Sequence, residues 1–457
     1  MIPLWHSDDI ARATGGTCSV PFAGTGVSID TRTLQPGDLF VALVGEHGDG
    51  HAFVADALGR GAAGALVHQA PPGAADTPLV VVGNTLDALN ALGAFARARF
   101  TGRVLAVTGS VGKTTCKEML RAALAATGPV HAAEASYNNH WGVPLTLARM
   151  PPGHAFAVVE IGMNHPGEIA RLAEIAAPTV AVVNNAQREH LEFMASVQAV
   201  ARENGGAIAA LAGGGVAVFP ADDAHAAIWR EIAGQRRLVT FALAGAAAAD
   251  VTGSAIWHGD HSLVRMQTPA SAASFTLRVA GAHNVRNALA AGAAALAAGC
   301  PLDAIVRGLE GFRAVRGRSQ TKRLVRGGVE STLIDDTYNA NPDSVRAAID
   351  VLAALPAPRW LVLGDMAEVG DQGPEFHREV GAYARQRGIE SLWAAGAASG
   401  STVADFPGAR AFATVEELIA ALDRAPKAAS VLVKGSRFMR MERVVRALTG
   451  EAGDLHA

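Results

Sequence analysis

The sequence is poor in cysteine, in aromatic residues and in net charge. Its 457 residues include three cysteines, Cys18, Cys116 and Cys300, which stand far apart. This spacing excludes a disulfide framework and a cysteine metal site, and it fits a reducing compartment. The formal net charge of -3 gives no electrostatic reason to expect nucleic acid or an anionic membrane as a partner.

Two kinds of apolar segment are also missing. The N-terminus has no basic stretch followed by an apolar core, so we expect no signal peptide. No run of about 18 purely apolar residues occurs, which predicts no insertion into a membrane. Because half of the residues are hydrophobic and 18% are charged, we expect a globular protein of the cytoplasm, acting as a monomer.

The chain is too long for one hydrophobic core, and its pattern divides into three α/β domains. Residues 1–84 contain short strand-like runs and a helix. Residues 85–313 begin with a helix at 85–100 and then alternate apolar strands with helices, which predicts a largely parallel sheet. A small antiparallel insert of two strands is expected at 245–280. Residues 314–457 repeat the alternation in a Rossmann-like pattern.

The most informative segment is 108–115, which reads TGSVGKTT. It follows an apolar run and precedes a helical pattern, and a glycine loop in that position favours anion binding by backbone N–H groups. Lys113 can reach the β- and γ-phosphates of a nucleotide, and the Thr114 hydroxyl can ligate Mg²⁺. Val107 stands where the general pattern has its first glycine. The other predicted nucleotide contacts in this loop are Gly109, Ser110, Val111, Gly112 and Thr115.

Polar side chains follow two further strands at the same predicted sheet edge. Glu160 ends an apolar strand, and carboxylate oxygen suits Mg²⁺, a hard cation. His190 follows the next strand; an isolated histidine is more often a packed or surface residue, but its place at this edge favours a role beside the phosphates. We therefore predict a metal site of Thr114, Glu160 and His190, and we expect Lys113, Glu160 and His190 to be catalytic.

Two polar loops supply further candidates. The amides of Asn138 and Asn139 suit contacts with phosphate or substrate, although asparagine is also an ordinary turn residue. In the third domain, Asp336 follows a strand and can accept a hydrogen bond from a ribose hydroxyl. Asn341 precedes a proline and can cap the next helix.

Basic residues of the third domain are the remaining candidates. Arg318 can clamp a phosphate across a domain boundary, or it can be a solvated linker arginine. Lys434, Ser436 and Arg437 end the last clear strand. They offer two cations and a hydroxyl to an anionic group, although a surface turn would look much the same.

Together these motifs resemble those of the Mur ligase family, the ATP-dependent amide-bond ligases of peptidoglycan precursor synthesis. The resemblance runs over essentially the whole chain, and the family's own form of the phosphate loop explains the missing glycine. The matching segments are TGSVGKTT at 108–115, SYNN at 136–139, GVPLT at 142–146, EIG at 160–162, NHPGE at 164–168, YNANP at 338–342, LGDMAE at 363–368 and KGSR at 434–437.

The resemblance implies a small UDP-sugar-binding domain, a central ATPase-like domain with a phosphate loop and a C-terminal Rossmann-like domain. It is strongest to the branch that joins D-alanyl-D-alanine to a UDP-N-acetylmuramoyl-tripeptide, which implies these two substrates, ATP and Mg²⁺. ATP then phosphorylates the tripeptide carboxylate, and the dipeptide amine attacks the acyl phosphate. The implied ATP contacts beyond the loop are Asn284, Asn287, Arg318 and Asp336. The implied substrate contacts are Asp30, Thr31, Arg32, Asn138, Asn139, Tyr338, Asn339, Asn341, Lys434, Ser436 and Arg437.

One position departs from the family pattern. Many members carry a lysine after the His190 region that becomes carbamylated and helps to bind Mg²⁺. Its place here falls on Arg202 or Asn204, and neither side chain can form that carbamate. We hypothesise that Glu203 supplies a carboxylate instead.

Two alternatives to this ligase remain open at this stage. The first is another member of the superfamily, such as the ligase that adds the third peptide residue or a folylpolyglutamate synthase. The second is a nucleotide-gated binding protein in which the phosphate loop is a switch.

Overall fold

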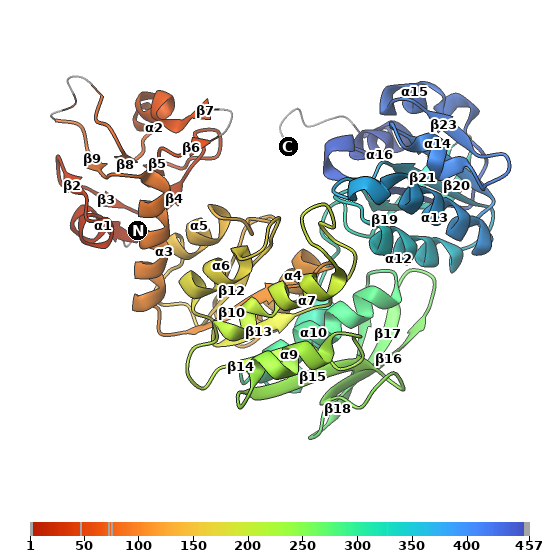
Figure 1. Ribbon diagram of the computed structural model, residues 1–457, viewed down its shortest axis with the longest axis horizontal. Helices are drawn as coiled ribbons and strands as arrows, with labels where there is room; N and C mark the ends of the chain where they lie inside the picture. The colour runs from red at the N-terminus through yellow and green to blue at the C-terminus, as the bar shows by residue number, and fades with distance from the viewer. Residues whose placement is uncertain (1–2, 46–47, 72–73, 75, 327, 452–457) are drawn as a thin grey trace.

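The computed structural model describes residues 3–45, 48–71, 74, 76–326 and 328–451. Figure 1 shows three α/β units, with the N-terminal unit in red and orange and the C-terminal unit in blue standing on either side of the central unit. This arrangement confirms the three-domain α/β fold expected from the sequence. Within the described ranges, no helix is long and apolar enough to cross a membrane.

The N-terminal unit is built on a five-stranded sheet, and the helix α3 joins it to the rest of the chain. The Asn84 side chain caps α3 (Thr85–Arg99) by accepting hydrogen bonds from two backbone N–H groups. Leu89 and Leu92 of α3 pack in the same core as Leu39. The strands, in spatial order, are β2 (Thr17–Cys18), β9 (Leu79–Val81), β8 (Gly64–Val67), β5 (Asp38–Val41) and β4 (Gly26–Ser28), and the helices are α1 (Ser7–Thr14) and α2 (Val54–Gly59).

The central unit is a nine-stranded sheet whose first seven strands in spatial order are parallel. The segment expected as a two-stranded insert has three strands, of which the first was missed. The first continues the parallel part of the sheet, and the other two follow through antiparallel pairing. The spatial order is β11 (Val130–Ala132), β12 (Phe156–Glu160), β10 (Arg103–Thr108), β13 (Val180–Val183), β14 (Val216–Pro220), β15 (Arg237–Leu243), β16 (Val251–Trp257), β17 (Ser262–Gln267) and β18 (Ala272–Leu277).

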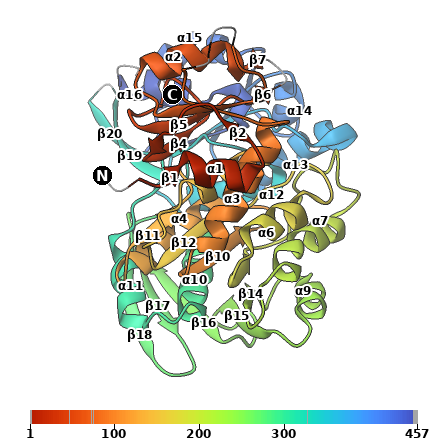
Figure 2. The same cartoon turned by 90° about the vertical axis from the view of Figure 1, so that its left-hand side faces the viewer.

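Helices cover both faces of the central sheet, as Figure 2 shows. One core forms against α4 (Lys113–Ala125), α10 (Ala282–Ala297) and α11 (Leu302–Gly311). The other forms against α5 (Gly142–Ala148), α6 (Glu168–Ala176), α7 (Val197–Asn204), α8 (Gly206–Ala209) and α9 (Ala226–Ala233).

The helix predicted at 196–212 is divided into α7 and α8 at a glycine pair. Glycine weakens a helix interior. It also permits close packing here, because a Cβ at Gly206 would lie 3.1 Å from the backbone nitrogen of Ala170.

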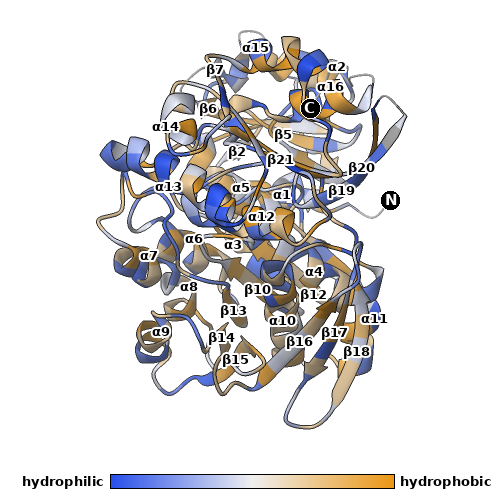
Figure 3. Cartoon of the chain, turned by 90° about the vertical axis from the view of Figure 1, so that its right-hand side faces the viewer, coloured by the Kyte–Doolittle hydropathy of each residue, from blue (hydrophilic) through white to orange (hydrophobic). Residues whose placement is uncertain are grey.

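The C-terminal unit has a six-stranded sheet with one antiparallel edge strand, β19, which the sequence prediction missed. Asn341 caps α12 as expected, since its side chain accepts from Ser344 N at 2.8 Å. In Figure 3 hydrophilic residues gather on the outer helix α13 and hydrophobic residues on the strands of the central sheet. The strand order is β19 (Gln320–Arg326), β20 (Val329–Asp336), β24 (Ser430–Lys434), β21 (Arg359–Gly364), β22 (Ser391–Ala395) and β23 (Arg410–Phe412), and the main helices are α12 (Pro342–Ala353), α13 (Gly373–Gln386), α15 (Val415–Ala420) and α16 (Glu442–Thr449).

Candidate active site

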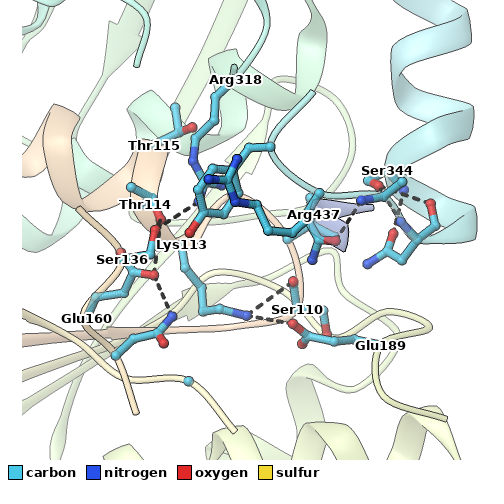
Figure 4. A pocket seen from close by; sticks show the side chains of 18 of the residues that line it. Ser110, Lys113, Thr114, Thr115, Ser136, Glu160, Glu189, Arg318, Ser344 and Arg437 are labelled. Atoms are coloured by element: carbon cyan, nitrogen blue, oxygen red, sulfur yellow. Dashed lines mark hydrogen bonds and ion pairs between the residues drawn. The ribbon is translucent and has the colours of Figure 1, made fainter. Parts of the chain in front are cut away.

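A cavity of about 400 Å³ lies between the central and C-terminal units. The central unit lines it with the phosphate loop, with Ser136 and residues 138–140, with Glu160 at the end of β12, with Glu189 and His190 and with the start of α10. The C-terminal unit lines it with residues 317–319, with Asp336, with residues 338–341 and with Arg437. Figure 4 shows Lys113, Thr114 and Glu160 in this pocket, with the long side chains of Arg318 and Arg437 extending toward them.

The phosphate loop connects β10 directly to α4, and two of its positions require glycine. Gly109 and Gly112 have positive φ angles of 129° and 82°. A Cβ at Gly112 would lie 2.4 Å from Asn287 Oδ1. Two side chains that follow β13 fix the position of the loop: Asn184 and Asn185 each donate a hydrogen bond to the Val111 carbonyl at 2.8 Å. Neither asparagine was predicted.

Lys113 is the first residue of α4, and its side chain reaches back to the phosphate loop. Its Nζ donates to Gly109 O at 2.6 Å and to Glu189 Oε1 at 2.7 Å. Both side chains are largely buried, so this ion pair is only weakly screened by solvent. Glu189 was not among the predicted residues, although it directly precedes His190.

Thr114 and Glu160 lie in contact, and one carboxylate oxygen of Glu160 has no hydrogen-bond donor among the described residues. Thr114 Oγ1 donates to Glu160 Oε1 at 3.1 Å, and Asn138 Nδ2 donates to the same atom at 2.8 Å. Glu160 is 1% exposed, and its Oε2 accepts no hydrogen bond from the described residues. A buried carboxylate oxygen without a partner is costly. This oxygen beside a hydroxyl makes a donor set that fits a hard cation such as Mg²⁺.

His190 lines the same cavity, but its ring lies beside other carboxylates. Nδ1 is 2.7 Å from Glu368 Oε2 of the C-terminal unit, and Nε2 is 3.6 Å from Glu189 Oε1. The imidazole holds the pKa of Glu368 below its usual value, against the opposing effect of burial. Across the described part of the chain there is no cluster of three or more histidine, cysteine or acidic side chains placed to hold a metal. The metal role of His190 therefore stays a prediction.

The asparagines at the start of α10 form a buried chain next to the loop. Asn287 Oδ1 accepts from Asn184 Nδ2 at 2.8 Å, and Asn287 Nδ2 donates to Asn284 Oδ1 at 3.0 Å. Both Asn284 and Asn287 line the cavity. Their predicted contact with the nucleotide is compatible with this position.

Asp336 and Lys434 form an ion pair in the C-terminal unit. Lys434 Nζ donates to Asp336 Oδ2 at 2.6 Å and to Asn339 O at 2.8 Å. Burial raises the pKa of Asp336, but the ammonium of Lys434 more than offsets it, and the pKa is lowered overall. Since the charge of Lys434 is balanced by Asp336, the pair sets the position of residues 336–339 at the cavity.

Arg318 reaches the phosphate side of the cavity from the C-terminal unit. Its guanidinium lies 3.8 Å from the centre of the Tyr338 ring, and Nη2 donates to Ser136 Oγ at 3.1 Å. The alternative of a solvated linker arginine is wrong for this position. Arg437 is also close to the Tyr338 ring, at 5.7 Å.

Other residues predicted to contact the substrate form hydrogen bonds within the protein. Asn139 Oδ1 accepts from Gly142 N at 2.9 Å, and Ser436 Oγ donates to Ala340 O at 3.1 Å. Asn341, the cap of α12, and Asn339 line the cavity. Asp30, Thr31 and Arg32 lie in the N-terminal unit, outside this cavity, with Arg32 Nη2 donating to Asp30 Oδ2 at 2.6 Å.

Asn204, at the end of α7, lies next to the strand that leads into the phosphate loop. Its Oδ1 accepts from Thr108 Oγ1 at 2.6 Å, and the side chain is buried. Glu203 points elsewhere, because its carboxylate accepts from Gly167 N and Ile169 N, both at 2.9 Å, at the start of α6. This contact favours a helix-capping role for Glu203.

Comparisons with known proteins match the chain over most of its length. The Mur ligase middle domain matches residues 107–295, the Mur ligase, glutamate ligase domain residues 317–437, and the Mur ligase family, catalytic domain residues 24–99. The UDP-N-acetylmuramoyl-tripeptide--D-alanyl-D-alanine ligase of Escherichia coli (strain K12) is 39% identical over 426 residues, which cover 92% of this chain and 93% of that protein. The protein of that name from Bacillus subtilis (strain 168) is 32% identical, covering 96% and 97%. The crystal structure of MurF from Acinetobacter baumannii has a TM-score of 0.88 at 32% identity, covering 98% of this chain and 100% of that one.

Proposed function

The chain belongs to the Mur ligase family, and from that premise we propose how its site works. The protein is an ATP-dependent ligase that adds D-alanyl-D-alanine to UDP-N-acetylmuramoyl-tripeptide in peptidoglycan precursor synthesis. The observation that carries the site assignment is a single cavity. In it the phosphate loop with Lys113 and the unpaired oxygen of Glu160 face Arg318 and Asp336 of the C-terminal unit.

In the first step the tripeptide carboxylate takes the γ-phosphoryl group. A carboxylate oxygen bonds to phosphorus while the bond to the β-phosphate oxygen breaks, which releases ADP and leaves an acyl phosphate. Such transfers depend mainly on positioning and charge neutralisation. Lys113 and the loop N–H groups supply positive charge from one side, and Arg318 supplies it from the other.

In the second step the free amine of D-alanyl-D-alanine attacks the activated carbonyl carbon. An amide bond forms, phosphate leaves and the amine loses a proton. The acyl phosphate must be kept from water in the meantime. The position of the cavity between two units suits this, because closing the units around the substrates excludes solvent.

Thr114 and Glu160 are the residues that would hold Mg²⁺, which when bound neutralises and orients the phosphate oxygens. Asp336 would contact the ribose, and the asparagines Asn284 and Asn287 the neighbourhood of the base. We also place the enzyme in the cytoplasm as a monomer, since one chain supplies both sides of the cavity.

Release of ADP is the experiment that tests this function. It should require UDP-N-acetylmuramoyl-tripeptide, and D-alanyl-D-alanine should be needed for sustained turnover. Hydrolysis of ATP that is indifferent to both substrates would instead support a nucleotide-gated binding protein. Turnover with a UDP-linked dipeptide and a third amino acid would support the other Mur-type ligase.

A further inference from the structure

Lys117 is a fully buried lysine on α4, one helical turn after Thr114, and it does not line the cavity. Its Nζ donates to Ala133 O at 2.7 Å and to Ala135 O at 2.6 Å, and it lies 2.9 Å from Glu118 Oε1. A buried ammonium group is costly unless each of its donors meets an acceptor. The three oxygens here match its three N–H bonds.

Two of these three partners are backbone carbonyls of the segment 133–136, which leads to the cavity. Ala135 has a φ of 47°, a left-handed conformation that a residue with a Cβ rarely adopts. The hydrogen bond to Ala135 O holds this unfavourable turn. The next residue, Ser136, then directs its Oγ to Thr114 Oγ1 and to Arg318 Nη2, both at 3.1 Å.

Thr114 and Lys117 lie three residues apart and therefore share one face of α4. Both reach the segment 133–136, and both approach Glu160, with Lys117 Nζ 4.0 Å from the oxygen that lacks a hydrogen bond. A lysine that served only to stabilise the fold would not need partners in the segment that connects the phosphate loop with Arg318.

We infer that Lys117 is a positioning residue of the ligase reaction. It fixes Ser136, and with it Thr114 and Arg318, for phosphoryl transfer. This role rests on the proposed function, but the position of the segment can be measured independently of turnover. The variants are Lys117→Met, Ser136→Ala and their combination. Arg121→Met, one turn further along α4 and exposed, is the matched control.

Hydrogen exchange of the amides at 133–138 is the measurement that does not depend on activity. Lys117→Met should increase exchange in this segment, and Arg121→Met should not. If Lys117→Met does not fold, Lys117→Arg, which keeps a charge and several donors, takes its place and should show a smaller increase. Unchanged exchange would overturn the inference, even if the protein had a different activity.

Turnover tests the functional part of the inference. Lys117→Met should lower kcat by about 10²-fold, the typical cost of a misplaced phosphate-site group, with the KM for D-alanyl-D-alanine unchanged. Because Lys117 acts through Ser136, the double variant should lose little beyond the larger single loss. Two losses that multiply, or a kcat for Lys117→Met equal to that of Arg121→Met, would contradict the positioning role. An inactive wild type would instead contradict the proposed function.

Discussion

Arg188 joins the central unit to the C-terminal unit, and its replacement by methionine tests whether that junction supports catalysis. Its guanidinium makes four hydrogen bonds to Asp343 and Glu379, at distances from 2.6 to 3.0 Å. It also lies over the Phe376 ring at 5.2 Å. Asp343 is on α12 and Glu379 on α13, so one side chain of the central unit is attached to two helices of the C-terminal unit.

The size of the effect follows from the exposure of these groups. The side chains of Arg188, Asp343 and Glu379 are 24% to 30% exposed, so solvent screens their ion pairs only in part. Hydrogen bonds between charged groups contribute about 1.5–3 kcal/mol each, but they are not additive and exposed pairs are worth much less. We therefore assign about 2 kcal/mol to the junction, which corresponds to a factor of about 30 in an equilibrium constant.

The contact between the two units places Arg318 and Asp336 at the phosphate loop. Weakening this contact should therefore lower the catalytic efficiency with ATP. We expect Arg188→Met to lower kcat/KM for ATP by roughly 10- to 30-fold, measured as ADP release with saturating tripeptide and dipeptide. The control is Arg346→Met. Arg346 bonds the same Glu379 at 3.0 Å but lies wholly within the C-terminal unit. Equal kcat/KM values for Arg188→Met and the wild type would refute the reasoning.

Three further predictions concern single residues. Lys113→Ala should abolish turnover while the protein still folds, as judged by circular dichroism, because its charge acts on the phosphates; retained turnover would remove it from the site. Asp336→Asn leaves the buried Lys434 charge without its partner and should lower stability at pH 7 by about 3–5 kcal/mol, measured by urea unfolding. The pKa of Asp336 is lowered in the fold, so the stabilisation by its carboxylate is present above the ordinary aspartate pKa of about 4 and is lost as the pH falls below that value. The difference in unfolding free energy between the wild type and Asp336→Asn should therefore shrink at low pH. A difference that stays constant with pH would contradict an ion pair between Asp336 and Lys434. Glu203→Gln should weaken the N-terminus of α6 by about 1 kcal/mol and leave the Mg²⁺ dependence of turnover unchanged, whereas a changed dependence would restore Glu203 as a metal ligand.

The sequence predicted the phosphate loop and the sheet edge well, because both are local patterns. A glycine loop between a strand and a helix has few other uses, and parallel strands end at one edge. The contact of Thr114 with Glu160 follows that topology.

The partners that hold these residues could not be predicted in the same way. Asn184 reaches the loop only because β13 pairs with β10 in one particular register. Lys117 looks like any lysine of an amphipathic helix until the segment 133–136 is seen to pack against it. The edge strand β19 was missed because its residues are mostly polar and charged.

The transfer of an oxygen atom from substrate to phosphate tests the central claim most directly. UDP-N-acetylmuramoyl-tripeptide labelled with ¹⁸O in its terminal carboxylate is incubated with the enzyme, ATP and D-alanyl-D-alanine, and the released phosphate is examined by mass spectrometry. If the carboxylate is activated as an acyl phosphate in the cavity between the central and C-terminal units, one labelled oxygen should appear in each phosphate formed. Phosphate that carries no label while the amide product accumulates would contradict the mechanism.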